Sequence, residues 1–352
     1  MAYTSNELNS REETTDRDPT ARTRKKDHIE LAFRSQVAGG ELDDRFFYEP
    51  ILAGHPEKGS LPELSFLGKS MKLPVWVSSM TGGTEMAHTI NHNLARACGE
   101  FGMGMGLGSC RSLLYSNDNL PDFAVRHLIG DQPLYANLGI AQVEELVVAE
   151  AFHKLEELVK KLEADGLIIH VNPLQEWLQP EGDRFAYSPL HTIQRVLEAL
   201  PTLNIIVKEV GQGMGKESLR ALLALPLQAV DFAANGGTNF ARLELMRSDE
   251  QRQQIYRELA LVGHSAAEMV DLVNELILEE GALACPQIII SGGVKTFLDG
   301  YYLTQKIQLP AIYGQASSFL KHARDDYDTL RTYVQTQVEG LELAHAFLRV
   351  RS

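Results

Sequence analysis

Cysteine, basic charge and long apolar runs are all scarce in this sequence of 352 residues. Its three cysteines, Cys98, Cys110 and Cys285, lie far apart without a CxxC pair, which argues against a disulfide framework or a thiolate zinc site and suits a reducing cytoplasm. Lys and Arg number 33 against 47 Asp and Glu, and this net charge of -14 argues against a nucleic acid or an anionic membrane as partner. Because the sequence has neither a run of about 18 apolar residues nor the apolar core of a secretory signal, we expect no membrane span and no secretion.

The length and the 44% of hydrophobic residues allow a large core. A chain of this length fits two average domains, or one barrel of about 250 residues with additions. Residues 1–23 are polar, with almost nothing to bury, so we predict a disordered leader there and a single domain over residues 24–352.

Short apolar runs recur along the chain after a hairpin-like segment that begins at residue 64, and each ends in Gly, Ser, Asn or a charged residue. Segments between them carry apolar residues at helical spacing, for example Val143, Leu146 and Val147. Strands that alternate with helices are typical of parallel βαβ units, and eight of them predict a closed (β/α)8 barrel. The expected strand centres are Val77, Leu107, Ala136, Ile169, Val207, Ala233, Ile290 and Tyr313. The long interval between Ala233 and Ile290 predicts an insertion after the sixth strand.

A doubly wound sheet is the alternative architecture, and its phosphate-binding motifs are missing. GMGMGLG (102–108) does not fit GxGxxG, and GQGMGK (211–216) is one residue short of a Walker loop, with Glu217 in the place of Ser or Thr. The barrel therefore remains the favoured architecture.

One stretch, HVNPLQE (170–176), follows the apolar run 166–169 and ends it in an imidazole, two carboxamides and a carboxylate. A buried strand delivers polar groups to a site in this way, although a surface loop would have the same composition. In a barrel, the chemistry gathers at the C-terminal ends of the strands, and all eight expected ends carry polar or glycine-rich stretches. Together these ends predict a site.

Several of these strand ends suit a flat ring with acceptor atoms and one phosphate, and flavin mononucleotide (FMN) fits that description. Lys208 extends from an apolar strand and needs an acceptor partner, whereas Gly292, Gly293 and the stretch after the eighth strand can offer backbone N–H groups to a phosphate. Other phosphorylated ligands also bind such barrels. The candidate cofactor-binding residues are Ser79, Met80, Thr81, Ser109, Asn137, Lys208, Thr238, Gly292, Gly293, Lys295, Ala316 and Ser317.

The sequence resembles type II isopentenyl diphosphate isomerase, and the likeness covers residues 24 to about 320. It rests on RKKDH (24–28), SSMTGG, GSCR, HVNPLQE followed by QPEGD, VKEVG, NGGTNFARLE and SGGVKT. The resemblance implies that isopentenyl and dimethylallyl diphosphate are interconverted with reduced FMN, Mg²⁺ and NAD(P)H as reductant, by a homo-oligomer (tetramer or octamer) in the cytoplasm. It also implies that the substrate is held by Arg24, Lys25, His28, Ser109, Arg111, His170 and Asn172.

The same resemblance places Gln175 at the reacting carbons, with His170 also in a catalytic position, and makes Glu176 the metal ligand. Phe240 stands where the family often has Trp, which should keep an apolar wall. Two other functions remain open: an FMN oxidoreductase of the 2-hydroxy-acid oxidase type, and a flavin-binding protein without catalysis. The first would need a histidine base but no diphosphate-binding arm, and the second would leave Gln175 and Glu176 without a role.

Overall fold

A computed structural model describes residues 20–79 and 85–351, and it divides into two compact units, Met1–Arg45 and Phe46–Ser352. In the first unit, the described residues form helix α1 (Ala21–Leu31) and a 3-10 turn η1 (Gly39–Glu41). Most of the expected disordered leader, residues 1–19, lies outside the described residues, and residues 21–23 already belong to α1. The side chains of α1 are exposed or partly exposed, and Lys26 forms an ion pair with Glu30 one helical turn later.

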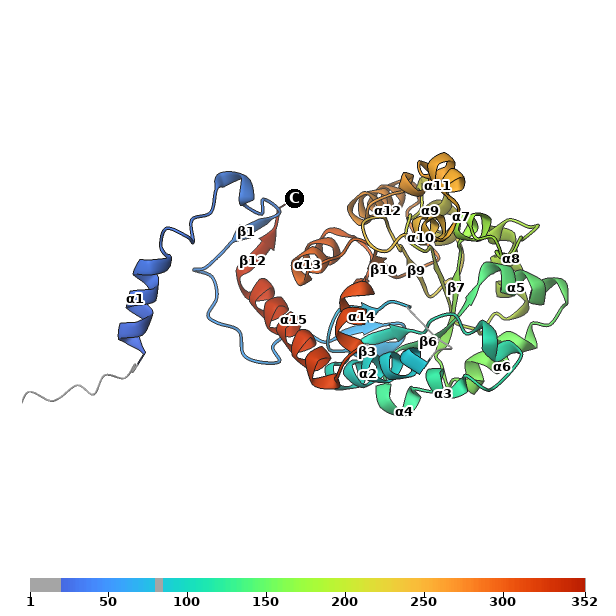
Figure 1. The fold of residues 1–352 in the computed structure, drawn as a ribbon, viewed down its shortest axis with the longest axis horizontal. Helices are drawn as coiled ribbons and strands as arrows, with labels where there is room; N and C mark the ends of the chain where they lie inside the picture. The colour runs from blue at the N-terminus through green and yellow to red at the C-terminus, as the bar shows by residue number, and fades with distance from the viewer. Residues whose placement is uncertain (1–19, 80–84, 352) are drawn as a thin grey trace, which may run out of the picture. The chain divides into compact units, whose positions relative to one another are not determined.

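The second unit is built on a closed barrel of eight parallel strands with helices around it (Figure 1), as predicted. The strands are β4 (Val75–Val77), β5 (Gly104–Gly106), β6 (Leu134–Gly139), β7 (Gly166–His170), β8 (Ile205–Lys208), β9 (Ala229–Asp231), β10 (Ile288–Ser291) and β11 (Ala311–Gln315). Six of the eight expected centres lie inside these strands. Leu107 and Ala233 fall just beyond β5 and β9, because both apolar runs stay buried after the last paired residue.

The longer helices between and after the strands carry one apolar stripe each. They are α2 (Glu85–Phe101), α5 (Ile140–Val148), α6 (His153–Lys161), α8 (Pro189–Ala199), α9 (Lys216–Leu223), α12 (Ala266–Glu280), α13 (Phe297–Lys306), α14 (Ser317–Ala323) and α15 (Tyr327–Phe347). The helical pattern that begins at Val143 is split between α5 and α6, because Glu150 adopts a positive φ of 53° between them. None of the helices in the described residues is long and apolar enough to cross a membrane.

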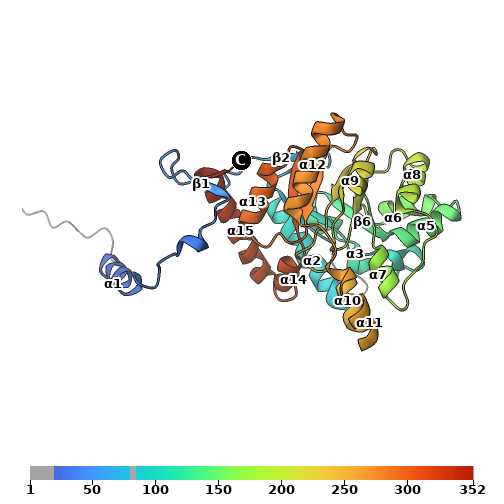
Figure 2. The same ribbon diagram turned by 90° about the horizontal axis from the view of Figure 1, so that it is seen from above.

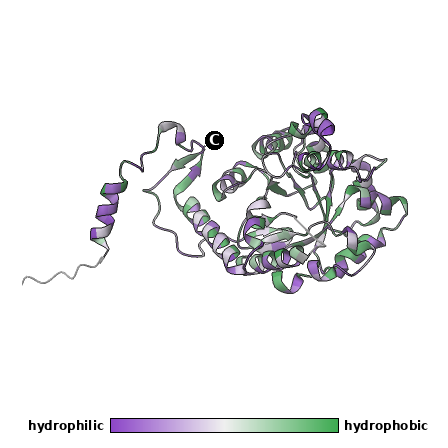
Figure 3. Cartoon of the chain, viewed as in Figure 1, coloured by the Kyte–Doolittle hydropathy of each residue, from purple (hydrophilic) through white to green (hydrophobic). Residues whose placement is uncertain are grey.

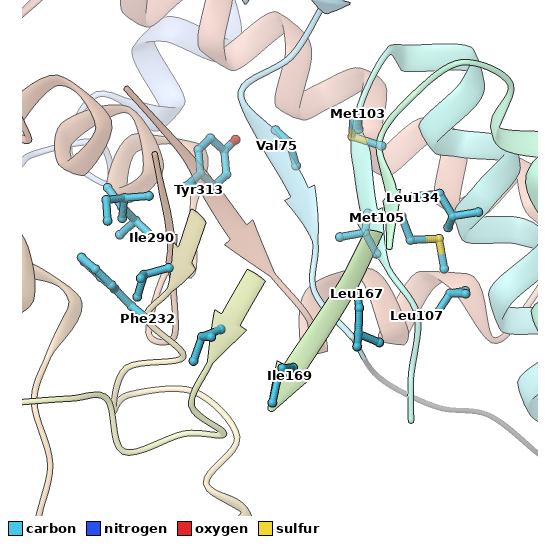
Figure 4. Packing of buried hydrophobic residues seen from close by; sticks show 14 of the residues in the cluster. Val75, Met103, Met105, Leu107, Leu134, Leu167, Ile169, Phe232, Ile290 and Tyr313 are labelled. Atoms are coloured by element: carbon cyan, nitrogen blue, oxygen red, sulfur yellow. The ribbon is translucent and has the colours of Figure 1, made fainter. Parts of the chain in front are cut away.

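The main core lies between the barrel and these helices. Alternate strand residues such as Met105, Leu167, Ile169 and Ile290 point outward into it (Figure 4). In Figure 3 the hydrophobic colour follows the barrel strands, whereas the helices carry both colours. This two-sided burial explains why the strands appear in the sequence as nearly continuous apolar runs.

The N-terminal end of the barrel is closed by the expected hairpin, β2 (Leu64–Phe66) and β3 (Lys69–Met71). Its two-residue turn, Leu67 and Gly68, has positive φ at both positions, as a type I′ turn requires. Phe66 and Met71 pack against the inward side chains of the strands, so this end is sealed by apolar groups. A second antiparallel pair joins β1 (Phe46–Tyr48) to β12 (Leu348–Val350).

The insertion predicted after the sixth strand is present. It holds α10 (Phe240–Arg247), α11 (Glu250–Tyr256) and a 3-10 turn η3 (Leu259–Leu261). Helix α10 lies beside α7 (Pro173–Leu178), which follows β7 (Figures 1 and 2). The two helices share a small core of their own, apart from the main one, made of Leu174, Leu178, Ala241, Leu245, Tyr256 and Ala260. Shorter segments complete the unit: η2 (Arg111–Leu114), α3 (Leu120–Phe123) and α4 (Arg126–Ile129).

Candidate active site

The inward side chains at the C-terminal end of the barrel form a polar layer. Inside the barrel, one layer of apolar residues comes first, and on most strands the inward residue two positions later is polar. The apolar layer contains Trp76, Tyr135, Ile168, Ile206, Ala229, Ile289 and Ile312. The polar layer contains Ser78, Asn137, His170, Lys208, Asp231 and Ser291. The strands therefore gather their charged, carboxamide and serine side chains at one end of the barrel.

A cavity of about 340 Å³ opens at this polar end. Ser78, Lys208 and Ser291 of the polar layer line it, together with Ser79, Thr238 and Phe240. Among the residues that the structure describes, the hydroxyl oxygens of Ser78 and Ser79 are buried and have no hydrogen-bond partner. Because buried polar atoms without partners are costly, these two oxygens and the Lys208 ammonium suit a ligand that has both donors and acceptors.

One side of the cavity is formed by backbone. Gly292 and Gly293 have φ of 86° and 73°, and a Cβ on Gly292 would meet the backbone of Ala234 at about 2 Å, so only glycine fits there. Ala316 and Ser317, at the start of α14, and Lys295 complete this side. Ala316 offers no side-chain cap to α14. Free N–H groups at a helix start, near a lysine, suit a phosphate.

His170 is held as a neutral ring. Asn137 donates its Nδ2 to the carbonyl of Leu107 (2.9 Å), so its Oδ1 accepts from His170 Nδ1 (2.8 Å). Burial, reinforced by the Lys208 cation, lowers the pKa of His170 to about 3. The Nδ1 of the ring is thus protonated, and its Nε2 is left as a hydrogen-bond acceptor.

Helix α7 presents three polar side chains as one network. Asn172 is buried and donates its Nδ2 to Glu176 Oε1 (2.9 Å) and Gln175 Oε1 (3.2 Å). Gln175 in turn donates to Glu244 of α10 (Nε2 to Oε1, 3.5 Å). Glu244 is buried and accepts from Arg247. Because both ends of the Gln175 amide have partners, its orientation is set before any ligand arrives.

The loop after α7 connects this network to Arg111. Asp183 donates its backbone N–H to Glu176 Oε2 (2.7 Å), and its own Oδ2 accepts from Arg111 Nη1 (2.6 Å) and Gln142 Nε2 (2.8 Å). Glu144 holds the same loop further along, through the N–H groups of residues 186 and 187. The ends of the second and fourth strands thereby become one continuous polar surface.

Curated relatives of the chain agree in name. It is 36% identical over 331 residues to an isopentenyl-diphosphate delta-isomerase of Rickettsia rickettsii (strain Sheila Smith), with 91% of each chain covered. It is 32% identical over 335 residues to the protein of that name from Rickettsia typhi, again with 91% of each covered. The chain belongs to the isopentenyl-diphosphate delta-isomerase family. The predicted family and the predicted isomerase class are thus confirmed.

Solved structures similar to this isomerase-family chain share its barrel. A mandelate oxidase variant with a monooxide FMN adduct gives a TM-score of 0.53 at 13% identity, covering 86% of this chain and 83% of that one. A flavocytochrome b2 variant with benzoylformate gives a TM-score of 0.57 at 13% identity, covering 87% and 76%. At such low identity the likeness shows the fold alone. No family model matches the chain.

The residues predicted from the sequence fall into three groups in this isomerase-family protein. Those that line the cavity are Ser79, Lys208, Thr238, Gly292, Gly293, Lys295, Ala316 and Ser317. Those that do not line it but are joined by hydrogen bonds in the polar layer, in the α7 network or in the loop after α7 are Arg111, Asn137, His170, Asn172, Gln175 and Glu176. The third group lies apart from both. Ser109 is exposed next to Cys110. On α1 of the first unit, Arg24, Lys25 and His28 are exposed, and Met80 and Thr81 lie outside the described residues.

The residues of the polar layer and the α7 network that the sequence analysis did not single out include Ser78, Gln142, Asp183, Asp231, Glu244 and Ser291. Asp183 and Glu244 end the family motifs QPEGD and NGGTNFARLE, but nothing in the motifs says which side chains they contact. Asp231 interrupts the apolar run 229–234, and an acid in such a position is the signal that could have identified it. Gln142 carries no such signal.

Proposed function

We propose that this protein interconverts isopentenyl diphosphate and dimethylallyl diphosphate by a 1,3-allylic proton shift, with reduced FMN, Mg²⁺ and NAD(P)H as reductant. The names of its relatives support the reaction. The observation that carries the proposal is the position of α10: its Phe240 lines the cavity, and its Glu244 contacts Gln175 on α7. The preset carboxamide therefore adjoins a cavity with the features of a flavin site.

The residues of the cavity fit FMN. The partnerless Ser78 and Ser79 hydroxyls and the Lys208 ammonium can bond the polar edge of the ring, and Gly292, Gly293 and the start of α14 can hold the phosphate. When bound in reduced form, the flavin would supply an electron-rich ring with exchangeable N–H protons, which suits proton transfer to an alkene. Phe240 gives this ring an apolar wall.

Gln175 has the role of orienting the alkene. A carboxamide is a poor acid or base near neutral pH, so it contributes by position, and its two hydrogen bonds fix that position. Glu244 is then a positioning residue for Gln175. Neutral His170 offers an acceptor at Nε2 beside Lys208, and it becomes a donor to the diphosphate only when it gains a proton.

Glu176 is the proposed ligand for magnesium. Each of its oxygens accepts one hydrogen bond and keeps a lone pair for a cation. The described residues contain no group of three or more His, Cys, Asp or Glu that could hold a metal by themselves. Substrate phosphates and water would thus supply the remaining ligands, as is common for magnesium.

The anionic end of the substrate needs cations, which Arg111, Arg24, Lys25 and His28 can supply, with Ser109 and Asn172 as neutral donors. Arg111 is already oriented by Asp183 and keeps further N–H groups for a diphosphate. We also propose a cytoplasmic homo-oligomer, a tetramer or octamer, because that assembly is implied by the family resemblance.

The proposed function is tested by comparing the oxidised and the reduced protein without oxygen. Substrate and product have the same oxidation level, so the flavin must leave each cycle reduced. We expect little activity from the oxidised protein on isopentenyl diphosphate, activation by NAD(P)H or dithionite, many turnovers per electron pair, and deuterium in the product formed in deuterated water. Consumption of reductant in proportion to product would instead indicate an oxidoreductase.

The metal assignment has a separate test. Glu176→Gln keeps the size of the side chain and loses its charge, so the Mg²⁺ concentration for half-maximal rate should rise about tenfold or more while flavin content stays unchanged. Glu198→Gln, on the surface of α8, is the matched control. An unchanged magnesium dependence in the Glu176 variant would remove this residue from the metal site.

A further inference from the structure

Asp231 is a fully buried carboxylate that the proposed chemistry leaves unused. It ends β9 and lies opposite Lys208 in the register of β8 and β9, so both side chains point into the polar layer. Its Oδ1 accepts from the Ser291 hydroxyl, which itself accepts from the backbone N–H of Ala233. Its Oδ2 is buried and has no hydrogen-bond partner in the described part of the chain. A structural acceptor for Ser291 alone would not need the second oxygen or the charge.

The charge next to Asp231 is that of Lys208. The Lys208 ammonium donates to the carbonyl of Glu209 (2.6 Å), and its charge acts on Asp231 through space. Lys208 and Asp231 are cross-strand neighbours and both are buried, so salt screens their attraction much less than that of an exposed pair. The pKa of Asp231 is raised, chiefly by burial, and the Lys208 charge, the Ser291 hydroxyl and the Ala233 N–H oppose that rise.

The other titratable groups nearby leave this pair alone in the layer. His170 is neutral, because burial and Lys208 lower its pKa to about 3. Burial raises the pKa of Glu209, and its carboxylate turns away to accept from the N–H groups of Gly211, Gln212 and Gly213. The charge that the layer presents to the cavity is therefore set by Lys208 and Asp231 together.

We propose that Asp231 is a positioning residue that supplies the counter-charge of Lys208, so that the polar layer presents no net charge to the cofactor ring. The inference rests on the proposed function. A lone ammonium beside the reduced ring would favour its anionic form and draw off the N1 proton. With Asp231 ionised, the reduced ring keeps that proton, which is the state able to donate to an alkene.

The test measures the protonation of reduced FMN on four proteins: the parent, Asp231→Asn, Lys208→Met and the double variant. The readout is the absorption spectrum of the anaerobically reduced, FMN-saturated protein as a function of pH. Asp231→Asn keeps the acceptor for Ser291 and removes the charge, so the pKa of the ring proton should fall by about one to two units. Lys208→Met should raise it, and the double variant should return it toward the parent value. A purely structural role would not give shifts of opposite sign.

The control is Glu342→Gln, a buried acid on α15 that accepts from the N–H of Gly59, and it should leave the pKa of the ring unchanged. Equal pKa values of the ring proton in the parent and in Asp231→Asn would overturn the inference. If Asp231→Asn does not fold or does not retain FMN, Lys208→Met is compared with the double variant instead. The pKa of the ring proton must then be lower in the double variant than in Lys208→Met, and equal pKa values in these two proteins overturn the inference. A parent protein that binds no FMN overturns the proposed function as well, whereas a flavin-dependent parent with an indifferent Asp231 overturns this inference alone.

Discussion

The two layers of side chains inside the barrel come from the same strands, two residues apart, and do opposite things. Ile206 lies in the apolar layer and Lys208 in the polar one, and the same step separates Ile168 from His170 and Ala229 from Asp231. The apolar layer packs against the hairpin β2–β3, whereas three residues of the polar layer, Ser78, Lys208 and Ser291, line a cavity. A period of two therefore lets one short strand serve both the core and the site.

The layers also differ in energy. Apolar burial stabilises the fold by about 25 cal/mol for each Å² removed from water. Among the described residues, the polar end keeps the Ser78 and Ser79 hydroxyls, Asn172 Oδ1 and Asp231 Oδ2 buried without partners, each at a cost of about 1 to 3 kcal/mol. The apolar layer carries such a cost only at Trp76 Nε1 and the Tyr135 hydroxyl. The apolar layer thus supports a site that is unfavourable by itself, and a ligand that satisfies the atoms of the polar end should stabilise the protein.

The largest effect that separates the two ends is expected at Gln175. Gln175→Ala removes the oriented carboxamide, so kcat should fall about 10³-fold, while the free energy of unfolding changes by less than about 1 kcal/mol. Steady-state rates of the reduced enzyme and urea unfolding measure the two quantities. Gln335→Ala, which removes an exposed carboxamide on α15, is the control. Normal turnover in the Gln175 variant would show that this side chain is not at the reacting carbons.

The apolar layer should respond in the opposite way. Ile206→Ala leaves a cavity below Lys208, so the free energy of unfolding should fall by about 3 kcal/mol. The kcat of the folded fraction should stay within about twofold of the parent, because no polar group is lost. Denaturant unfolding followed by circular dichroism measures the first quantity. A large loss of kcat with unchanged stability would mean that the layers are not separate in function.

His170 lies at the boundary of this comparison and predicts a pH dependence. The pKa of His170 is about 3 in the folded state, against 6.5 for an ordinary histidine side chain. Below about pH 6.5, the unfolded chain therefore binds a proton at this residue that the folded chain does not bind. Stability from this residue is present above pH 6.5 and falls as the pH drops toward 3. Part of the ring is exposed, so we expect about 2 kcal/mol of difference between the parent and His170→Gln from about pH 6.5 to pH 4. Parallel curves of unfolding free energy against pH would contradict a neutral His170.

The sequence predicted the barrel well because eight apolar runs ending in polar residues leave few other folds. Eight of the twelve candidate cofactor-binding residues line the cavity for the same reason, since the strand ends of a parallel barrel meet at one place. What the sequence could not give is the pairing between distant side chains. Gln175 and Glu244 lie 69 residues apart, which is a longer separation than any single sequence motif spans. The Arg111–Asp183 pair likewise depends on how two loops pack. The role of Asp231 depends on strand register, which an apolar run alone does not specify.

The smallest expected effect concerns Lys25, outside the barrel unit. On α1 it is exposed beside Arg24 and His28, in a protein whose net charge of -14 should repel an anion. If this cluster binds the diphosphate, Lys25→Ala should raise KM about tenfold and leave kcat and flavin content unchanged, because the lost contact is the same in the ground and transition states. Since the cluster is exposed, the effect should shrink as salt rises from about 0.05 M to 0.5 M. Lys160→Ala, an exposed lysine on α6, should change neither constant. Equal KM values for parent and Lys25 variant at low salt would limit anion binding to the barrel unit, with Arg111 and the ends of the strands.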